Sequence, residues 1–245
     1  MSTFVLVHGA WQGISTWDLI VPNLQRAGHK VFTPVLTGLG TDSHRLSPAV
    51  NLDAHIDDVT SLLKNEGLQE ITLVGHSYAG MVITAVAERE GRRLRRLVYV
   101  DAFVPGDGES ALDLLPENIQ ESFREQARTK GEGWRLPASE GLLDLWGLQA
   151  RAAREYVRAR LCDFSLRCFE QKVRLRSNAA AKLPKTFIAA VGQNYPASSI
   201  FEPFREKARH EGWDYHELPT GHDCHVEAPE VFVSLLLAGN ARSAI

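Results

Sequence analysis

The 245-residue sequence predicts an α/β fold, a doubly wound and mostly parallel sheet that carries an inserted helical cap. Short β-rich runs alternate with helical patterns before residue 105 and again after residue 183, as βαβ units require. Between these points the chain carries helical patterns broken by Gly and Pro, with no convincing strand. We therefore expect a core of residues 1–104 and 184–245 and a helical cap of residues 105–183.

Six short runs of apolar and β-branched residues are the predicted strands. Polar residues do not interrupt the first of them, so we expect that strand to be buried on both faces, as in a parallel sheet covered by helices. The six runs are residues 4–7, 31–36, 71–74, 97–100, 186–191 and 213–218.

Apolar residues at helical spacing predict the helices between these strands. Gly28 and Gly67 end two of them, since glycine is favoured just after a last helical turn. Asn51 or Asp53 can cap the start of the second helix. The predicted core helices cover residues 16–27, a segment around 56–63, and residues 81–90, 199–209 and 229–237.

Composition and charge exclude several classes of protein. Lys and Arg number 27 against 30 Asp and Glu, so the chain has no basic excess and nucleic acid is not an expected partner. No apolar run approaches the ~20 residues of a membrane span. The first residues lack the features of a secretion signal, and we expect a cytoplasmic protein. Cys162, Cys168 and Cys224 are odd in number and match no metal motif, so neither a disulfide framework nor a zinc site is expected.

The segment 73–80, LVGHSYAG, runs from a predicted strand directly into a predicted helix. Its serine, Ser77, has small residues two positions away on each side, Gly75 and Ala79. A sharp strand–turn–helix bend needs them, because bulky side chains there would clash. The N-terminus of the following helix favours negative charge. Ser77 is therefore the predicted nucleophile.

A serine hydroxyl is a poor nucleophile unless a base takes its proton. His222 follows the last predicted strand, and the sheet order places its loop at the same carboxyl edge as Ser77. His225 is a weaker rival, His76 is expected to point elsewhere, and His8 to order a loop. His222 is the predicted base. The remaining histidines, His29, His44, His55, His210 and His216, are expected at the surface or as caps.

An oxyanion hole needs two converging N–H donors. The backbone amide of Tyr78, the residue after the nucleophile, is one predicted donor. The other is expected from the loop after the first strand, where Gly9 lets the backbone approach closely. We assign it to the Ala10 amide, with the Trp11 amide as the alternative.

These motifs resemble the α/β-hydrolase superfamily, and within it the small-esterase branch that includes plant methyl esterases and hydroxynitrile lyases. The resemblance covers most of residues 3–104 and 186–237, and it implies the same roles for Ser77, His222 and the two amides. In overall look the chain is also similar to bacterial esterases of xenobiotics, such as pyrethroid or benzimidazole-carbamate hydrolases. The matching pieces are VLVHGAW at 5–11, AGHKV at 27–31, VGHS at 74–77, and His222 with Pro229 after it.

The acid that completes a catalytic triad with Ser77 and His222 departs from the family pattern. Relatives usually carry an Asp in the loop after the strand at 186–191, but here that loop reads GQNYP. A carboxylate is still needed to orient the imidazole. In some α/β-hydrolases, including haloalkane dehalogenases and a fungal-toxin lactonase, the carboxylate comes instead from the end of the preceding core strand. This chain resembles them in that respect. Asp101 stands there and is the predicted acid, with Glu202, Asp107 and a neutral Asn194 as alternatives.

Aromatic residues are expected to line an apolar substrate pocket. Trp11, Phe103, Trp134 and Trp146 are the main candidates. Further candidates in the cap are Leu142, Leu145 and Phe164.

Together these features predict a serine hydrolase without cofactor or metal, which cleaves a small, mostly apolar carboxylic ester through an acyl-enzyme. The alternative is a carbamate or amide hydrolase of a xenobiotic such as a benzimidazole carbamate. A hydroxynitrile lyase is disfavoured because the lyases of the family carry Thr and Lys where this chain has Gly9 and Asp223. A non-catalytic receptor is disfavoured by the intact site. The expected partner is a small-molecule ester or carbamate, and a homodimer is left open.

Overall fold

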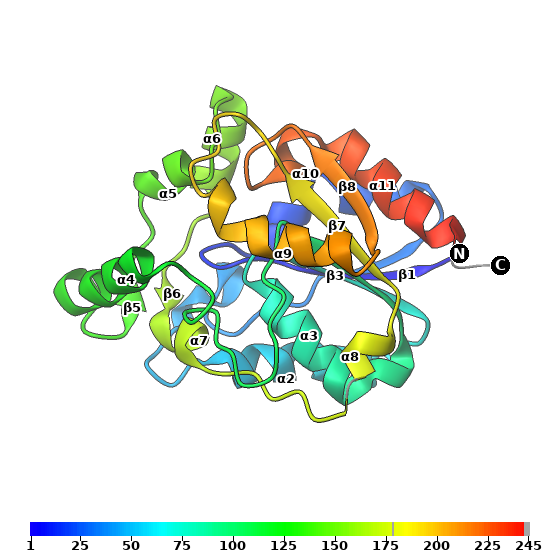
Figure 1. The fold of residues 1–245 in the computed structure, drawn as a ribbon, viewed down its shortest axis with the longest axis horizontal. Helices are drawn as coiled ribbons and strands as arrows, with labels where there is room; N and C mark the ends of the chain where they lie inside the picture. Colours follow the sequence, from blue (N-terminus) through cyan, green and yellow to red (C-terminus); the bar gives the residue numbers. More distant parts are fainter. Residues whose placement is uncertain (178, 243–245) are drawn as a thin grey trace.

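A six-stranded parallel sheet forms the centre of the structure, a computed structural model that describes residues 1–177 and 179–242 (Figure 1). The strand order is β2-β1-β3-β4-β7-β8, and each neighbouring pair is parallel. The prediction of a doubly wound parallel sheet is confirmed. The strands are β1 (Thr3–Val7), β2 (Lys30–Phe32), β3 (Ile71–His76), β4 (Leu94–Val100), β7 (Lys185–Ala190) and β8 (Asp214–Leu218).

The central strands are buried on both faces, as their uninterrupted apolar runs predict, and every residue of β3 is buried. The edge strand β2 is shorter than the predicted run 31–36. Its register with β1 ends at the pair Val5 and Phe32. Pro34 follows closely, and because proline has no N–H to donate, it cannot continue the ladder.

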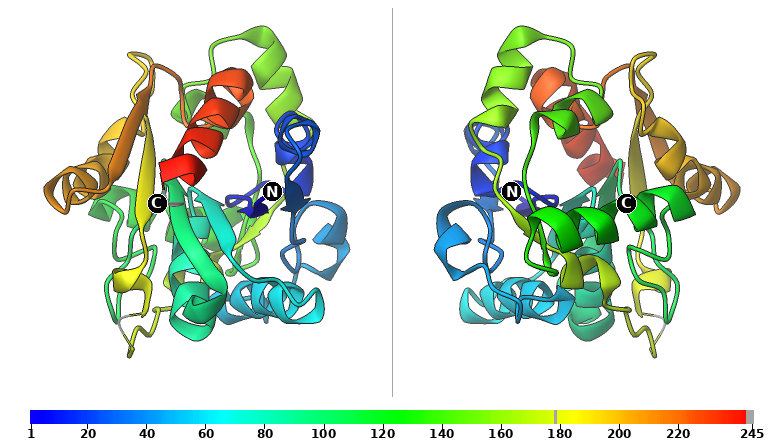
Figure 2. Two further views of the ribbon diagram at one scale, coloured as in Figure 1. Left: turned by 90° about the vertical axis from the view of Figure 1, so that its right-hand side faces the viewer. Right: turned by 90° about the vertical axis from the view of Figure 1, so that its left-hand side faces the viewer.

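Helices cover both faces of this sheet (Figures 1 and 2). One face carries α1 (Val21–Arg26) and α11 (Pro229–Arg242), and the other carries α2 (Leu52–Asn65) and α3 (Ala79–Glu90). A further helix, α9 (Ser198–His210), packs against β7 and β8. Short helical turns complete the core: η1 (Ile14–Trp17), η2 (Gly40–Arg45), η3 (Gly91–Arg93) and α10 (Cys224–Glu227).

Two helix starts show the expected local chemistry. The Asn51 side chain accepts a hydrogen bond from the Ala54 amide at 3.0 Å, so Asn51, rather than Asp53, caps α2. The predicted helix 16–27 is divided into η1 and α1. Pro22 stands in the first turn of α1, where its missing N–H costs nothing, whereas it would break the interior of one longer helix.

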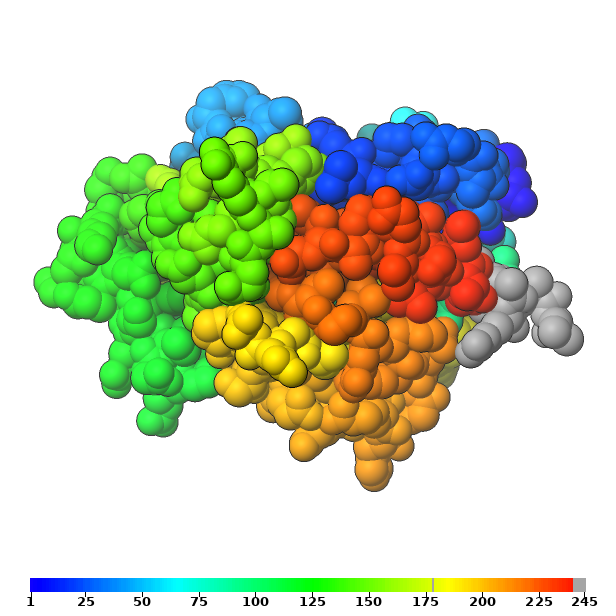
Figure 3. All heavy atoms as spheres, turned by 90° about the horizontal axis from the view of Figure 1, so that it is seen from above, coloured from blue at the N-terminus to red at the C-terminus, as the bar shows by residue number. Residues whose placement is uncertain are grey.

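Most of the segment between β4 and β7 lies at the carboxyl ends of the strands, whereas its last part runs back along α3 (Figure 1). In the space-filling view its green part occupies one end of the molecule and abuts the C-terminal elements (Figure 3). Its helices are α4 (Glu117–Lys130), α5 (Glu140–Leu145), α6 (Arg151–Arg158), α7 (Leu166–Glu170) and α8 (Ala179–Lys182). Of these, α8 packs against α3 of the core.

The expectation that residues 105–183 contain no strand is wrong. The short strands β5 (Arg135–Leu136) and β6 (Phe164–Ser165) pair antiparallel inside this segment. Two residues are too few to show a period of two, so the pattern of apolar residues could not reveal them.

A bilayer-crossing segment is also not found: within the described parts of the chain, no helix combines the length and the apolar character that this would need.

Candidate active site

Ser77 lies at a sharp bend between β3 and α3 and is partly exposed. Its φ is +57°, a left-handed conformation that is strained for a residue with a side chain. The bend is tightly packed. A Cβ atom on Gly75 would lie 2.8 Å from the Ala79 carbonyl oxygen, and one on Gly80 only 2.0 Å from that of Phe103. The sequence motif indicated the need for small residues at 75 and 79 but missed Gly80, because the loop that contacts it is remote in sequence.

The loop after β4 holds this bend from the other side. The Ser77 amide donates to the Val100 carbonyl at 3.1 Å, and the Phe103 amide donates to the Ser77 carbonyl at 3.2 Å. Between these two contacts lies Asp101, whose φ of +40° is also left-handed. The backbone of the predicted acid is thus fixed directly to the backbone of the predicted nucleophile.

His222 and Asp101 are brought together by the fold. The His222 Nδ1 atom lies 2.8 Å from Asp101 Oδ2, and both side chains are buried. The His222 amide donates to the carbonyl of Trp146 at 2.8 Å, so the cap also fixes the histidine loop. Ser77 and His222 line the same cavity. A buried carboxylate in contact with Nδ1 fixes the orientation of the imidazole ring.

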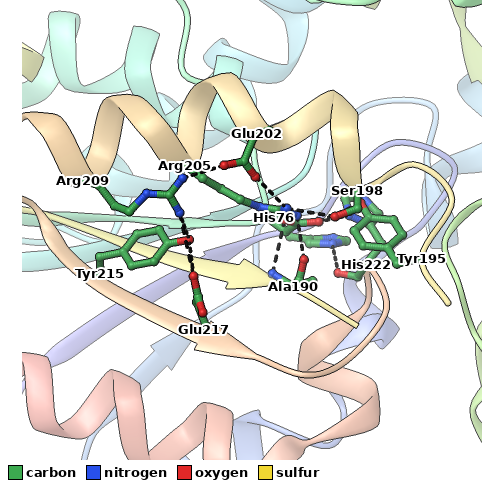
Figure 4. Close-up of polar contacts among 11 residues, drawn as sticks. His76, Ala190, Tyr195, Ser198, Glu202, Arg205, Arg209, Tyr215, Glu217 and His222 are labelled. Carbon is green, nitrogen blue, oxygen red and sulfur yellow. Dashed lines mark hydrogen bonds and ion pairs between the residues drawn. The ribbon is translucent and has the colours of Figure 1, made fainter. Parts of the chain in front are cut away.

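The alternative acids lie elsewhere. Glu202 is half-exposed on α9 and pairs with two arginine side chains of the same helix (Figure 4). Asn194 is exposed, and Asp107 accepts a backbone amide in the cap. Among the hydrogen bonds of the described residues, none joins any of these three to His222, whereas Asp101 contacts it directly.

Two side chains that the sequence did not single out hold the carboxylate of Asp101. The Tyr195 hydroxyl donates to Oδ2 at 2.7 Å and lies 2.9 Å from Nδ1 of His222. The Arg205 guanidinium donates to Oδ1 at 3.0 Å. The only available signal for Tyr195 was its place in the GQNYP loop, and for Arg205 there was none. Burial and the neighbouring Asp101 raise the pKa of Tyr195 well above its usual value, so this phenol stays protonated.

The loop after β1 approaches the nucleophile closely. A Cβ atom on Gly9 would lie 3.0 Å from His76 Nδ1 and 3.1 Å from the Cβ of Ser77, so a larger residue at this position would force its neighbours to shift. Among the described residues, neither the Ala10 amide nor the Tyr78 amide donates a hydrogen bond to the protein. The same holds for the Trp11 amide, so both candidates for the second oxyanion donor keep an unused N–H.

His55 is not at the surface, contrary to expectation. It is fully buried on α2, and its ring nitrogens contact the Tyr78 hydroxyl at 3.1 Å and the Thr37 carbonyl at 3.0 Å. Burial lowers its pKa to about 4. These contacts fix the Tyr78 side chain beneath the site.

His76 and His225 do not replace His222 as the base. His76 is buried, and its Nε2 atom lies 3.1 Å from the carbonyl oxygen of His222. The Nε2 atom of His225 lies 3.0 Å from Thr16 Oγ1, and burial lowers the pKa of His225 to about 3. Both rings therefore pack beneath the His222 loop.

Asp223, the residue after the base, is fully buried and accepts a hydrogen bond from the Gln12 side chain at 2.8 Å. Burial raises its pKa above the usual range. Gln12 belongs to the loop after β1, so this contact joins the loop that carries the Ala10 amide to the loop that carries His222. The ligand-type atoms of His76, Asp223 and His225 lie within 4.8 Å of one another, but each of the three side chains already has a protein partner.

A narrow cavity of about 50 Å³ lies between these residues and the cap. Apart from Ser77 and His222, its lining is apolar. The predicted residues Trp11, Phe103 and Trp146 belong to it, as do Leu142 and Leu145. The other lining residues are Leu115, Ile119, Phe123, Phe169, Ala197, Ile200 and Phe201.

The expectation that Trp134 lines this cavity is not met, since it is not among the lining residues. It stands in the turn before β5, partly exposed, and its carbonyl accepts from the Leu166 amide at 2.8 Å. Leu136 instead contacts the site, because its carbonyl accepts from the Trp11 indole N–H at 3.1 Å. Phe164 lies behind the cavity wall, with its ring 5.5 Å from that of Trp11.

Comparison with known proteins agrees with this geometry. Residues 4–235 match the model of the Alpha/beta hydrolase family. The chain is 35% identical to a carbendazim hydrolyzing esterase from Nocardioides sp., an alignment that covers 97% of this chain and 99% of the other. It is 32% identical to salicylic acid-binding protein 2 from Nicotiana tabacum over 54% of this chain and 48% of that one.

Solved structures that are similar to this chain are also α/β-hydrolases. An extracellular α/β-hydrolase from a Paenibacillus species is similar with a TM-score of 0.83 and 26% identity, covering 97% of this chain and 98% of that one. A pyrethroid hydrolase, at 20% identity and a TM-score of 0.77, shares the fold. The chain therefore belongs to the α/β-hydrolase family, and it is an enzyme of the esterase branch of that family.

Proposed function

We propose that this enzyme is a serine hydrolase that needs no cofactor and cleaves a small, mostly apolar carboxylic ester through an acyl-enzyme. The contact between His222 and Asp101, at 2.8 Å, carries the proposal, together with the cavity that Ser77 and His222 share. A hydroxyl, an imidazole and a buried carboxylate in this order are the groups that nucleophilic acyl transfer requires.

The reaction proceeds in two halves. The Ser77 Oγ atom attacks the carbonyl carbon while the Nε2 atom of His222 takes its proton. The carbonyl oxygen becomes an oxyanion and accepts hydrogen bonds from the amides of Ala10 and Tyr78. The bond to the alcohol oxygen then breaks, and His222 returns the proton to the leaving group. A water molecule, deprotonated by His222, releases the acid and restores Ser77.

The apolar lining of the cavity supports an uncharged substrate. Besides Ser77 and His222 it offers aromatic and aliphatic side chains, and the Trp11 indole N–H is already bonded to the cap. A charged group would lose its hydration there without a partner.

A carbamate is the second candidate substrate. The relative from Nocardioides sp., aligned over nearly the whole of both chains, is named for the hydrolysis of carbendazim. A carbamate carbonyl undergoes the same attack by serine, so the same residues would serve.

Replacement of Ser77 tests the proposal. We expect Ser77→Ala to lower kcat on a nitrophenyl ester by up to about 10⁶-fold. Ser61→Ala, on the exposed side of α2, is the matched control and should match the wild type. Full activity of Ser77→Ala would reject the proposal. The ratio of kcat/KM for a nitrophenyl ester and a methyl benzimidazole carbamate decides between the two substrate classes.

A further inference from the structure

We propose that Tyr195 is a positioning residue for Ser77, His222 and Asp101. Its hydroxyl fixes the Asp101 carboxylate relative to the His222 imidazole. This inference rests on the function proposed above. It concerns a residue that takes no part in the bonds that form or break, and that acts through Asp101 and His222.

The geometry is a closed triangle of hydrogen-bonding atoms. The Tyr195 oxygen lies 2.7 Å from Asp101 Oδ2 and 2.9 Å from His222 Nδ1, and these two atoms are 2.8 Å apart. The phenol O–H donates to the carboxylate, since an ionised carboxylate can only accept. The Nδ1 proton of His222 then faces two acceptors, the carboxylate and the phenol oxygen, both in fixed positions.

The second oxygen of Asp101 is held separately. Oδ1 accepts from the Arg205 guanidinium at 3.0 Å and from the Ala190 amide at 3.3 Å. Arg205 also donates to the Ala190 carbonyl, which fixes it against the end of β7 (Figure 4). With Oδ1 held on one side and Oδ2 held by Tyr195 on the other, the plane of the carboxylate is fixed before the imidazole becomes charged.

The loop that carries Tyr195 does not need this hydroxyl for its own shape. The Gly192 amide donates to the Thr220 carbonyl at 2.8 Å, and the Ala197 amide donates to the Leu145 carbonyl at 3.1 Å. The Tyr195 ring is buried and stacks on the ring of His222 with the centroids 5.8 Å apart. Phenylalanine would keep the ring and both anchors and would remove only the oxygen.

The test compares Tyr195→Phe with Tyr215→Phe, which removes a hydroxyl that contacts Glu217 at 3.0 Å on β8. We expect Tyr195→Phe to lower kcat on a nitrophenyl ester about 10-fold with KM unchanged. The pH of half-maximal rate should move upward, because Asp101 without its hydroxyl donor attracts the imidazolium proton more strongly. If kcat and the pH profile equal those of Tyr215→Phe, the proposal is wrong.

A second measurement uses the unmodified protein and no substrate. The Nδ1 proton of His222 should give a low-field proton NMR resonance that is lost in His222→Ala. We expect cross-relaxation between this proton and the ring protons of Tyr195, and its absence would overturn the inference even if Tyr195→Phe did not fold. Cross-relaxation in a protein that hydrolyses no ester or carbamate would support this contact and count against the proposed function.

Discussion

Asp101 is the residue with the densest polar environment in the site. It is fully buried, and its two oxygens accept from His222, Tyr195, Arg205 and the Ala190 amide. Its place at the end of a strand could be predicted from the sequence. Its contact with His222 was also predicted, but its contacts with Tyr195, Arg205 and the Ala190 amide were not, because these are 89 to 104 residues away in the chain and only the folded sheet brings them near.

Asp101→Asn tests this residue. We expect kcat to fall by about 10⁴-fold with little change in KM, because an amide favours the wrong imidazole tautomer. The folded state should persist, at a lower free energy of unfolding, since the buried Arg205 loses one of its two carboxylate partners and keeps only the half-exposed Glu202. Steady-state kinetics and circular dichroism on the same samples provide the measurement. A normal rate for Asp101→Asn, together with a lost rate for Glu202→Gln, would transfer the role to Glu202.

At the scale of elements, the loops that follow three adjacent central strands each contain a residue with a strained, positive φ. Trp11 after β1, Ser77 after β3 and Asp101 after β4 have φ values of +60°, +57° and +40°. Strain of this kind persists only where the surroundings fix it, and it gathers at functional sites. The serine motif predicted the second of these bends. The other two leave no local signal, because they depend on how the neighbouring loops pack.

Gly80→Ala tests the tight packing at the nucleophile bend. The added Cβ would lie 2.0 Å from the Phe103 carbonyl oxygen, so α3 or the loop after β4 must move. We expect the free energy of unfolding in urea to fall by about 1–3 kcal/mol or more. Gly141→Ala, at an exposed position of α5 where the added Cβ would lie 3.6 Å from Ser139 Oγ, is the control and should change stability by less than about 1 kcal/mol. Equal stability of the two variants would contradict the packing.

The cap shows where prediction from the sequence fails at this scale. Its helical character and its position between β4 and β7 follow from the pattern, but β5 and β6 do not. As a result, Trp134 was expected at the cavity, whereas Leu136, two residues later, contacts Trp11. A pocket formed between a cap and a core depends on their packing, which periodicity does not report. The core and cap boundaries at residues 104/105 and 183/184 stay a prediction.

At the scale of the whole molecule, buried neutral histidines link stability to pH. Burial lowers the pKa of His8 and of His55 to about 4 and that of His225 to about 3. In the unfolded chain these imidazoles take up protons near their ordinary value of about 6.5. Below that pH the unfolded state therefore binds more protons than the folded state, and acid favours unfolding.

We expect the free energy of unfolding to decrease as the pH falls from about 6.5 to about 4, at roughly 1.4 kcal/mol per pH unit for each fully buried histidine. Urea unfolding measured across this range provides the test. His44→Gln, at an exposed site, should leave the slope unchanged, and His55→Gln should reduce it. A stability that stays constant between pH 6.5 and 4 would contradict the neutral, buried state of these side chains.

We expect Ser77 to become acylated with the help of His222, and peptide mapping of a trapped intermediate can show this acyl group. The enzyme would be mixed with a nitrophenyl ester, quenched in acid within the first turnovers, digested and analysed by mass spectrometry. The acyl group should be on the peptide that contains Ser77, and it should be absent in His222→Ala. Acylation at another residue, or rapid turnover with no acylated peptide, would contradict this expectation.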